Sequence, residues 1–299
     1  MTSPVTDKWA AWLLERRHGG DARRMQAVLA RLYPVRDKVL NRIAGPDGEA
    51  VGTLLDVGCG DGLIAFGALD RFPSIRVVCA DVSQDLLDHA RSIAVTMGVA
   101  HRCEFVRAAA EDLSALADGA VDAVTMRSVL IYIADKPRVF REFHRVLKPG
   151  GRLSIFEPVN RVDPDAPVDI FWGLDMTPVR DLADRITAVY MKLQPPGADP
   201  MLNFDERDLV DYVEDAGFGE IHLTLEIEVV PIRRDPTIAL TWEALLRSAG
   251  YPQAPTLGEV MGQVLSPDEA ARFAAHLRPK VEAREGMRRS SAAFLWAMK

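Results

Sequence analysis

The sequence predicts an α/β fold in which a mostly parallel, seven-stranded sheet is covered by helices on both faces. Two observations support this expectation. From Thr53 onward, short apolar runs alternate with segments whose apolar residues recur at helical spacing, and a glycine-rich loop directly follows the first run. Strands that alternate with helices in this way form doubly wound parallel sheets, because each connection crosses back over one face.

Seven apolar or alternating segments are expected to be the strands. Turn residues or charged clusters bound them, as is usual for strands. The expected strands are 53–57, 76–80, 103–107, 121–126, 152–156, 221–230 and 289–298. Helical periodicity between them predicts helices at 63–70, 84–97 and 206–216, and a further helix that Asp135 caps and Pro149-Gly150-Gly151 ends.

Segments outside this alternation are expected to cover the sheet. Residues 7–44 have helical spacing that is interrupted before Asp21, which can cap the second helix. Helical patches are expected at 169–174, 179–193 and 236–285. The predicted division is an N-terminal helical lid at 1–50, a core at 51–160, a helical cap inserted near the C-terminus from 161–203 and 236–286, and the rest of the sheet at 204–235 and 287–299.

Composition and charge narrow the classes of partner. The 299 residues include 36 Lys and Arg against 43 Asp and Glu, a net charge of −7, whereas nucleic-acid binders usually present a basic face. Cys59, Cys79 and Cys103 are too few and too scattered for a disulfide framework or a CxxC metal site. No apolar run approaches the length of a membrane span. We expect a cytoplasmic protein, either monomer or homodimer, that binds no nucleic acid and no metal.

The glycine-rich loop is the strongest candidate for a binding site. In an open parallel sheet, ligands bind beyond the carboxyl ends of the strands, where Asp56-Val57-Gly58-Cys59-Gly60-Asp61-Gly62 lies. Its spacing is G-x-G-x-G, and Leu63 stands where the dinucleotide fingerprint requires glycine. No Gly-Lys-Ser/Thr of a phosphate-binding P-loop follows. Asp81 ends the next strand, where its carboxylate can accept hydrogen bonds from both ribose hydroxyls. Asp56 suits a cationic sulfonium ligand with an ammonium group better than a pyrophosphate.

Five motifs occur in order between residues 54 and 151. They are Leu54-Leu55-Asp56-Val57-Gly58-Cys59-Gly60-Asp61-Gly62, Asp81, Ala110-Glu111-Asp112-Leu113, Val121-Asp122-Ala123-Val124 and Leu147-Lys148-Pro149-Gly150-Gly151. In this set and order the chain resembles class I S-adenosylmethionine-dependent methyltransferases, especially the ubiquinone/menaquinone-biosynthesis and small-molecule branch. The resemblance covers residues 50–160 and, more weakly, 204–230 and 288–298. It implies a Rossmann-like fold and S-adenosylmethionine as the cofactor.

The resemblance also implies which residues hold the methionine and ribose part of the cofactor. Asp56, Gly58 and Gly60 would line this part, and Asp81 would hold the ribose diol. Arg127, at the end of the fourth strand, would lie beside the methionine moiety. An ordinary ion pair is the alternative for Arg127.

At the adenine end the resemblance implies a different set. Val82 would pack on the ring, and the stretch Ala109-Ala110-Glu111 would face its edge. The family often has Asp where Ala109 stands. Either Glu111 or backbone groups would therefore read the exocyclic amine, with Ala110 beside them.

Position along the chain suggests residues for the transfer step. Methyl transfer is an in-line displacement, and a general base is required only when the nucleophile is protonated. Tyr132 follows the fourth strand and Glu157 the fifth, so both should face the cleft above the methyl group. Packing on the next helix is the alternative for Tyr132, and a structural contact is the alternative for Glu157. His18 could act as a base if the N-terminal helices fold over the site, and a capping role is its alternative.

The expected reaction is methyl transfer to O, N or C of a small, apolar or aromatic organic molecule. Aromatic and Met residues of the cap suit an adaptable apolar pocket, although such residues are often core. Three other functions remain open. The first is metalloid methylation as in arsenite methyltransferases, a reaction that needs converging thiolates. The others are a non-catalytic cofactor-binding regulator and a hydride-transfer dehydrogenase. The cap residues are Phe171, Trp172, Met176, Tyr190, Met191, Trp242, Tyr251 and Met261.

Overall fold

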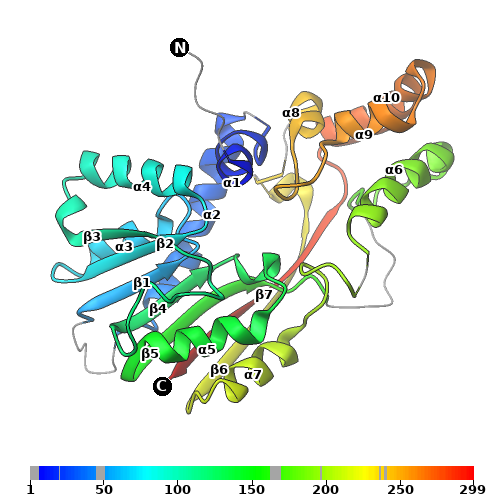
Figure 1. Cartoon of the computed structure of the whole chain (residues 1–299). Helices are drawn as coiled ribbons and strands as arrows, with labels where there is room; N and C mark the ends of the chain where they lie inside the picture. The colour runs from blue at the N-terminus through cyan, green and yellow to red at the C-terminus, as the bar shows by residue number, and fades with distance from the viewer. Residues whose placement is uncertain are drawn as a thin grey trace. The chain divides into compact units, whose positions relative to one another are not determined.

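The computed structural model of the chain describes residues 7–19, 21–44, 51–161, 170–195, 197–235, 237–238 and 241–299 (Figure 1). They cluster into two compact units, and each unit is described by itself. Unit 1 comprises 1–32, 163–199 and 227–290, and unit 2 comprises 33–162, 200–226 and 291–299.

Unit 2 is built on the predicted mostly parallel sheet. Within the described residues the sheet has seven strands in the order β3-β2-β1-β4-β5-β7-β6. Strands β1 to β5 pair in parallel, and β7 pairs antiparallel with β5. The strand order reverses between β1 and β4, which is where ligands of such sheets bind. The bounds are β1 Thr53–Val57, β2 Arg76–Asp81, β3 Cys103–Arg107, β4 Val121–Arg127, β5 Leu147–Pro158, β6 Ile221–Pro231 and β7 Met287–Met298.

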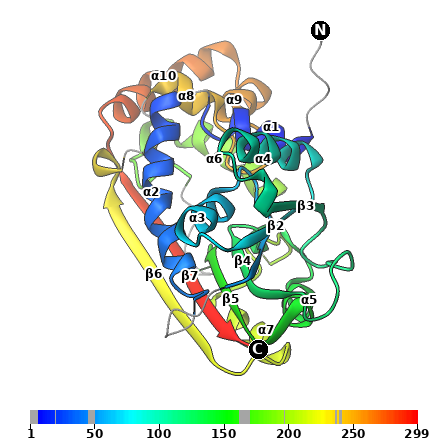
Figure 2. The ribbon, with the colours of Figure 1, turned by 90° about the vertical axis from the view of Figure 1, so that its left-hand side faces the viewer.

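Helices cover both faces of this sheet, so the doubly wound fold is confirmed. On one face, Leu55 and Met126 pack against α5 (Lys136–Val146) and α7 (Glu206–Asp215), which Figure 1 shows in front of the sheet. The opposite face carries Leu54 and Val77. They pack against the C-terminal end of α2 (Ala22–Leu40), α3 (Leu63–Arg71) and α4 (Gln84–Thr96). Figure 2 shows α2 and α3 side by side.

Helix α5 begins where its sequence predicts and ends earlier than expected. The Asp135 carboxylate caps it by accepting a hydrogen bond from the Arg138 N–H at 3.2 Å. The helix ends at Val146, whereas Leu147 was expected to belong to it. Residues 147–151, including the Pro149-Gly150-Gly151 run that was expected to stop the helix, form the first part of β5. A register shift between Val121 and Ala123 absorbs this Pro-Gly-Gly run, since a bulge lets a strand accommodate turn residues.

Unit 1 contains most of the remaining helices. Its apolar core brings Phe171 and Ile186 together with Val260, Phe273 and Leu277. The segment expected to be helical at 169–174 is a turn from 170 to 173, and residue 169 lies outside the described part. Trp172 and Gly173 have φ of 56° and 71°, which a right-handed helix cannot contain. The helices are α1 (Lys8–Ala11) with a π-helical turn (Trp12–Arg16), α6 (Arg180–Leu193), α8 (Trp242–Arg247), α9 (Leu257–Val264) and α10 (Pro267–Glu282).

Short 3-10 helices complete the described elements. Asp21 caps the N-terminus of α2 as predicted, because its Oδ1 accepts hydrogen bonds from the Arg23 and Arg24 N–H groups. None of the helices in the described ranges is both long and apolar enough to cross a bilayer. The 3-10 helices are Ala100–Arg102, Leu130–Tyr132, Thr177–Val179 and Ile232–Arg234.

Candidate functional site

The glycine loop leaves β1 at the switch point of the sheet in unit 2. Gly58, Gly60 and Gly62 have φ of 65°, 54° and 84°, a left-handed conformation that residues with a Cβ rarely adopt. A Cβ on Gly58 would lie 2.2 Å from Cγ2 of Val129. The loop therefore requires glycine for its backbone shape and for its close approach to the turn after β4.

Asp81 ends β2 beside this loop. Its Oδ2 accepts a hydrogen bond from the Gly60 N–H at 3.0 Å, and its Oδ1 accepts one from the Ser83 N–H at 2.9 Å. Asp81 thus ties the glycine loop to the end of β2 and to the residues that follow this strand.

Asp56 lies below the loop, inside the sheet. Its side chain is buried, and it accepts hydrogen bonds from Oγ1 of Thr125 at 2.8 Å and from the Ala65 N–H at 3.2 Å. Burial raises the pKa of Asp56 to about 7, although the Thr125 bond and the Arg127 charge lower it. Asp56 joins β1 to β4 and to the first turn of α3.

Glu157 supports the turn after β4. It is fully buried, and its Oε1 accepts a hydrogen bond from the Val129 N–H at 2.9 Å. Burial raises the pKa of Glu157 to about 7, although hydrogen bonds from this turn and the charge of Arg127 lower it. The Ser128 that opens the turn has a φ of 56°, which is uncommon outside glycine. Glu157 therefore sits under the turn and holds its backbone.

Arg127 is the cation of this site. Its charge lowers the pKa of both Asp56 and Glu157, although less than burial raises them. Arg127 is half-buried, and its side chain forms no hydrogen bond or ion pair with another residue among those the structure describes. Its guanidinium can therefore take a carboxylate from a ligand.

The residues predicted for the adenine end follow β2 and β3. Val82 is 42% exposed, so its apolar side chain is accessible to a planar ligand. The Ala108 N–H donates to the Asp81 carbonyl at 3.1 Å, which brings the end of β3 beside β2. Ala110 beyond it is buried, and Glu111 is half-buried. The structure thus brings all eight predicted cofactor residues to the carboxyl ends of β1 to β4 in unit 2.

The three residues predicted for catalysis are placed differently. Tyr132 ends the 3-10 helix Leu130–Tyr132 and packs partly buried against the core of unit 2. Glu157 lies beneath the same turn. His18 belongs to unit 1, where it is 7% exposed and lines a cavity.

Two residues that shape the site were not predicted. Thr125 holds Asp56, and Val129 packs on Gly58. A polar residue between the apolar Val124 and Met126 in the middle of a strand could have indicated Thr125. Nothing local in the sequence indicates the contact of Val129, because it joins segments far apart in the chain.

Comparison with known proteins agrees with this geometry. Residues 55–155 match the family described as "Methyltransferase domain". The tRNA 5-carboxymethoxyuridine methyltransferase of Escherichia coli (strain K12) is 31% identical over 116 residues, which are 39% of this chain and 44% of the relative. The human thiol S-methyltransferase TMT1A is 37% identical over 123 residues, 40% of this chain and 47% of the relative. The ubiquinone biosynthesis O-methyltransferase of Xanthomonas campestris pv. campestris (strain B100) is 37% identical over 138 residues, which are 45% of this chain and 54% of the relative.

Solved structures share the fold over more of the chain. The YcgJ protein from Bacillus subtilis has a TM-score of 0.51 at 14% identity, over 90% of this chain and 97% of that one. A second structure is phosphoethanolamine N-methyltransferase 2 from Haemonchus contortus in complex with phosphomonomethylethanolamine and S-adenosylhomocysteine. It has a TM-score of 0.51 at 18% identity, over 89% of this chain and 52% of that one.

Together the family match and the sequence relatives identify the class of the domain at residues 55–155. Residues 55–155 form a class I, S-adenosylmethionine-dependent methyltransferase domain, and the predicted family and cofactor are confirmed. The chain spans about half the length of these curated relatives, so its full activity and its acceptor are matters of proposal.

Proposed function

We propose that this chain transfers a methyl group from S-adenosylmethionine to O, N or C of a small organic molecule with an apolar or aromatic body. The observation that carries the proposal is the left-handed glycine loop that Asp81 holds at the switch point of the sheet. The loop keeps this shape only with glycine at position 58, because a side chain there would collide with Val129.

The residues at this edge fit the chemical groups of the cofactor. Asp81 would accept hydrogen bonds from the ribose hydroxyls, and Arg127 would pair with the carboxylate of the methionine moiety. Val82 would pack on the adenine, with Ala110 and Glu111 at its edge. When bound, S-adenosylmethionine supplies a methyl group already activated by its sulfonium.

The tasks left to the chain are alignment and exclusion of water. Glu157 would hold the turn that carries Tyr132, and Tyr132 would contact the acceptor. A base is needed only for a protonated nucleophile, and His18 remains the candidate for that role.

Cysteine chemistry argues against metalloid methylation. Cys59 and Cys79 are buried, and Cys103 is half-buried. The contact with Cys79 and burial raise the pKa of the Cys59 thiol, and burial raises that of Cys103 to about 11. Thiolates, which bind metalloids, are therefore disfavoured at neutral pH.

The test is to incubate the full chain with S-adenosylmethionine labelled in its methyl group and a cell extract, and then to identify what gains the label. We expect a labelled small molecule from the wild type and much less from Asp81→Asn. Label in RNA would replace the small-molecule acceptor by a nucleic acid. Absence of transfer with intact cofactor binding would favour the regulatory function.

A further inference from the structure

Unit 1 contains a cavity of about 490 Å³ whose lining residues all belong to that unit. This volume lies within the range of small-molecule sites, about 300–1,000 Å³. The walls come from the N-terminal segment, the turn at 170–172, α6, residues 237–238, the segment 245–257 and α10. The segments are distant in sequence, so only the folded unit forms this cavity.

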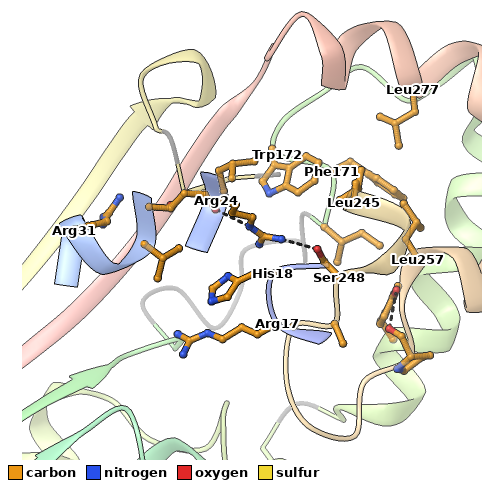
Figure 3. A pocket seen from close by; sticks show the side chains of 18 of the residues that line it. Arg17, His18, Arg24, Arg31, Phe171, Trp172, Leu245, Ser248, Leu257 and Leu277 are labelled. Carbon is orange, nitrogen blue, oxygen red and sulfur yellow. Dashed lines mark hydrogen bonds between the residues drawn. The ribbon is translucent and has the colours of Figure 1, made fainter. Parts of the chain in front are cut away.

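One wall of the cavity is cationic. Arg17, His18, Arg24 and Arg31 line it, and Figure 3 shows Arg24, His18 and Arg17 in succession on the side opposite Leu257 and Leu277. Among the described lining residues there is no Asp or Glu. The charge of Arg31 is nevertheless compensated, because it pairs with Asp235 and with Glu228 outside the lining.

Arg24 differs from Arg31 because its hydrogen-bond acceptors are neutral. Its Nε donates to the Thr237 carbonyl at 2.8 Å, and its Nη1 donates to Oγ of Ser248 at 2.5 Å. Burial lowers the pKa of Arg24, against the charges of Asp21 and Asp235. Arg24 forms no ion pair within the described part of the chain. A half-buried guanidinium whose hydrogen bonds go to neutral acceptors can form a charge-assisted hydrogen bond with a ligand anion.

Much of the remaining lining is apolar. Phe171, Trp172, Leu245, Leu257 and Leu277 contribute to it. The φ of 56° at Trp172 is exceptional for a bulky residue. This backbone is held by the Met287 N–H, which donates to the Trp172 carbonyl at 2.9 Å. Backbone strain that the surroundings enforce is often found at ligand sites.

We propose that this cavity binds an organic molecule that has an apolar or aromatic body and one anionic group, a carboxylate or a phosphate. Arg24 contacts the anion, and the wall around Trp172 receives the body. The same molecule is the methyl acceptor, an assignment that rests on the proposed function. His18, the candidate base, lines this cavity.

The test uses ligand-observed NMR on the full chain with a defined set of probes. The set contains octanoate, dodecanoate, 2-naphthoate, decyl phosphate and 2-naphthyl phosphate. Each carboxylate is accompanied by its neutral amide, and each phosphate by its neutral alcohol. We expect at least one anion to bind, and its neutral amide or alcohol to bind about ten-fold more weakly, which corresponds to about 1.4 kcal/mol. Lack of binding by every anion at about 1 mM, a free energy weaker than about −4 kcal/mol, would overturn the proposal.

Variants then locate the bound anion. Arg24→Gln should weaken binding about ten-fold, as expected for loss of a charge-assisted hydrogen bond. Arg23→Gln is the matched control, because Arg23 is exposed on the same helix and does not line the cavity. Leu245→Trp should fill the cavity and abolish binding even if Arg24→Gln unfolds. Equal binding by the wild type and a folded Arg24→Gln variant would contradict the role of Arg24.

Binding of S-adenosylhomocysteine is measured in the same samples. If it binds and no anion does, the cavity proposal fails and the proposed function stands. If anions bind and the cofactor does not, the proposed function fails and the cavity remains an anion site. If the labelled product carries no anionic group, the cavity does not hold the acceptor.

Discussion

Two buried carboxyl groups flank one arginine in the candidate cofactor site. Burial raises the pKa of Asp56 and of Glu157 to about 7, and Arg127 limits both shifts. Each acid is therefore divided between its protonated and ionised forms near neutral pH. The charge around Arg127 depends on pH in the range where most enzymes work.

This arrangement predicts how stability depends on pH. Because the folded pKa of Asp56 is raised, the folded chain keeps a proton between pH about 4 and about 7 that the unfolded chain loses. The stabilisation is complete below the unfolded pKa, falls as pH rises, and is lost above about 7, by about 1.4 kcal/mol per unit of pKa shift. In urea unfolding at pH 5 and pH 8, Asp56→Asn should show a smaller fall in stability than the wild type.

The exposed Asp70 provides the control for this measurement. Asp70→Asn should keep the pH dependence of the wild type. An equal fall in stability from pH 5 to pH 8 in Asp56→Asn and the wild type would contradict the buried state of Asp56.

Gly58 provides a second test at the level of single residues. In Gly58→Ala the new Cβ meets Val129 at 2.2 Å, and the φ of 65° adds strain. We expect S-adenosylhomocysteine to bind at least about ten-fold more weakly in calorimetry, since displacing the loop by strain costs about 1–3 kcal/mol. Gly98→Ala is the matched control, because Gly98 has a φ of 72° and nothing within 4 Å of its added Cβ. Gly98→Ala should lose about 1 kcal/mol of stability and keep its affinity. Wild-type affinity in Gly58→Ala would show that the loop does not shape the site.

Among the elements, the turn after β4 connects the cofactor edge to the predicted catalytic residues. It contains the left-handed Ser128, packs Val129 on the glycine loop and ends at Tyr132. Glu157 on β5 holds it from below. Two neighbouring strands thus determine where Tyr132 can lie.

Substitutions at Glu157 separate support of this turn from chemistry. Glu157→Gln retains an oxygen that can accept from the Val129 N–H, so cofactor binding and turnover should remain close to those of the wild type. Glu157→Ala leaves that N–H without its acceptor, which costs about 1–3 kcal/mol when the group is buried. We expect a lower melting temperature and weaker cofactor binding in Glu157→Ala. If Glu157→Gln abolished turnover while cofactor binding persisted, Glu157 would have a chemical role.

Elements that are determined by neighbouring residues in the sequence could be predicted well, whereas elements that depend on contacts with distant segments could not. Strands β1 and β3 have the predicted bounds, because apolar runs and their flanking residues define them locally. Strand β5 begins five residues before the expected 152, since pairing with β4 overrides the turn chemistry of Pro149-Gly150-Gly151. The turn at 170–173 was expected to be helical, because its apolar residues mimic helical spacing. Tertiary contacts decide such cases.

At the scale of the whole molecule, the cofactor edge was predictable and the cavity of unit 1 was not. The glycine loop and Asp81 are short motifs that follow consecutive strands, so topology alone brings them together. The cavity combines Arg24, Trp172 and Leu277 from three distant segments. Of the expected cap residues, Phe171, Trp172 and Tyr190 line it, whereas Met176, Trp242 and Met261 are buried in the core.

The most direct test of the central claim is a calorimetric titration of the full chain with S-adenosylhomocysteine. We predict saturable binding at one site per chain, which Asp81→Asn weakens about 10- to 100-fold, because hydrogen bonds to a charged group contribute about 1.5–3 kcal/mol. Asp88→Asn, at an exposed position on α4, should bind like the wild type. No binding to the wild type, or equal affinity in a folded Asp81→Asn variant, would contradict the assignment of this edge of the sheet as the cofactor site.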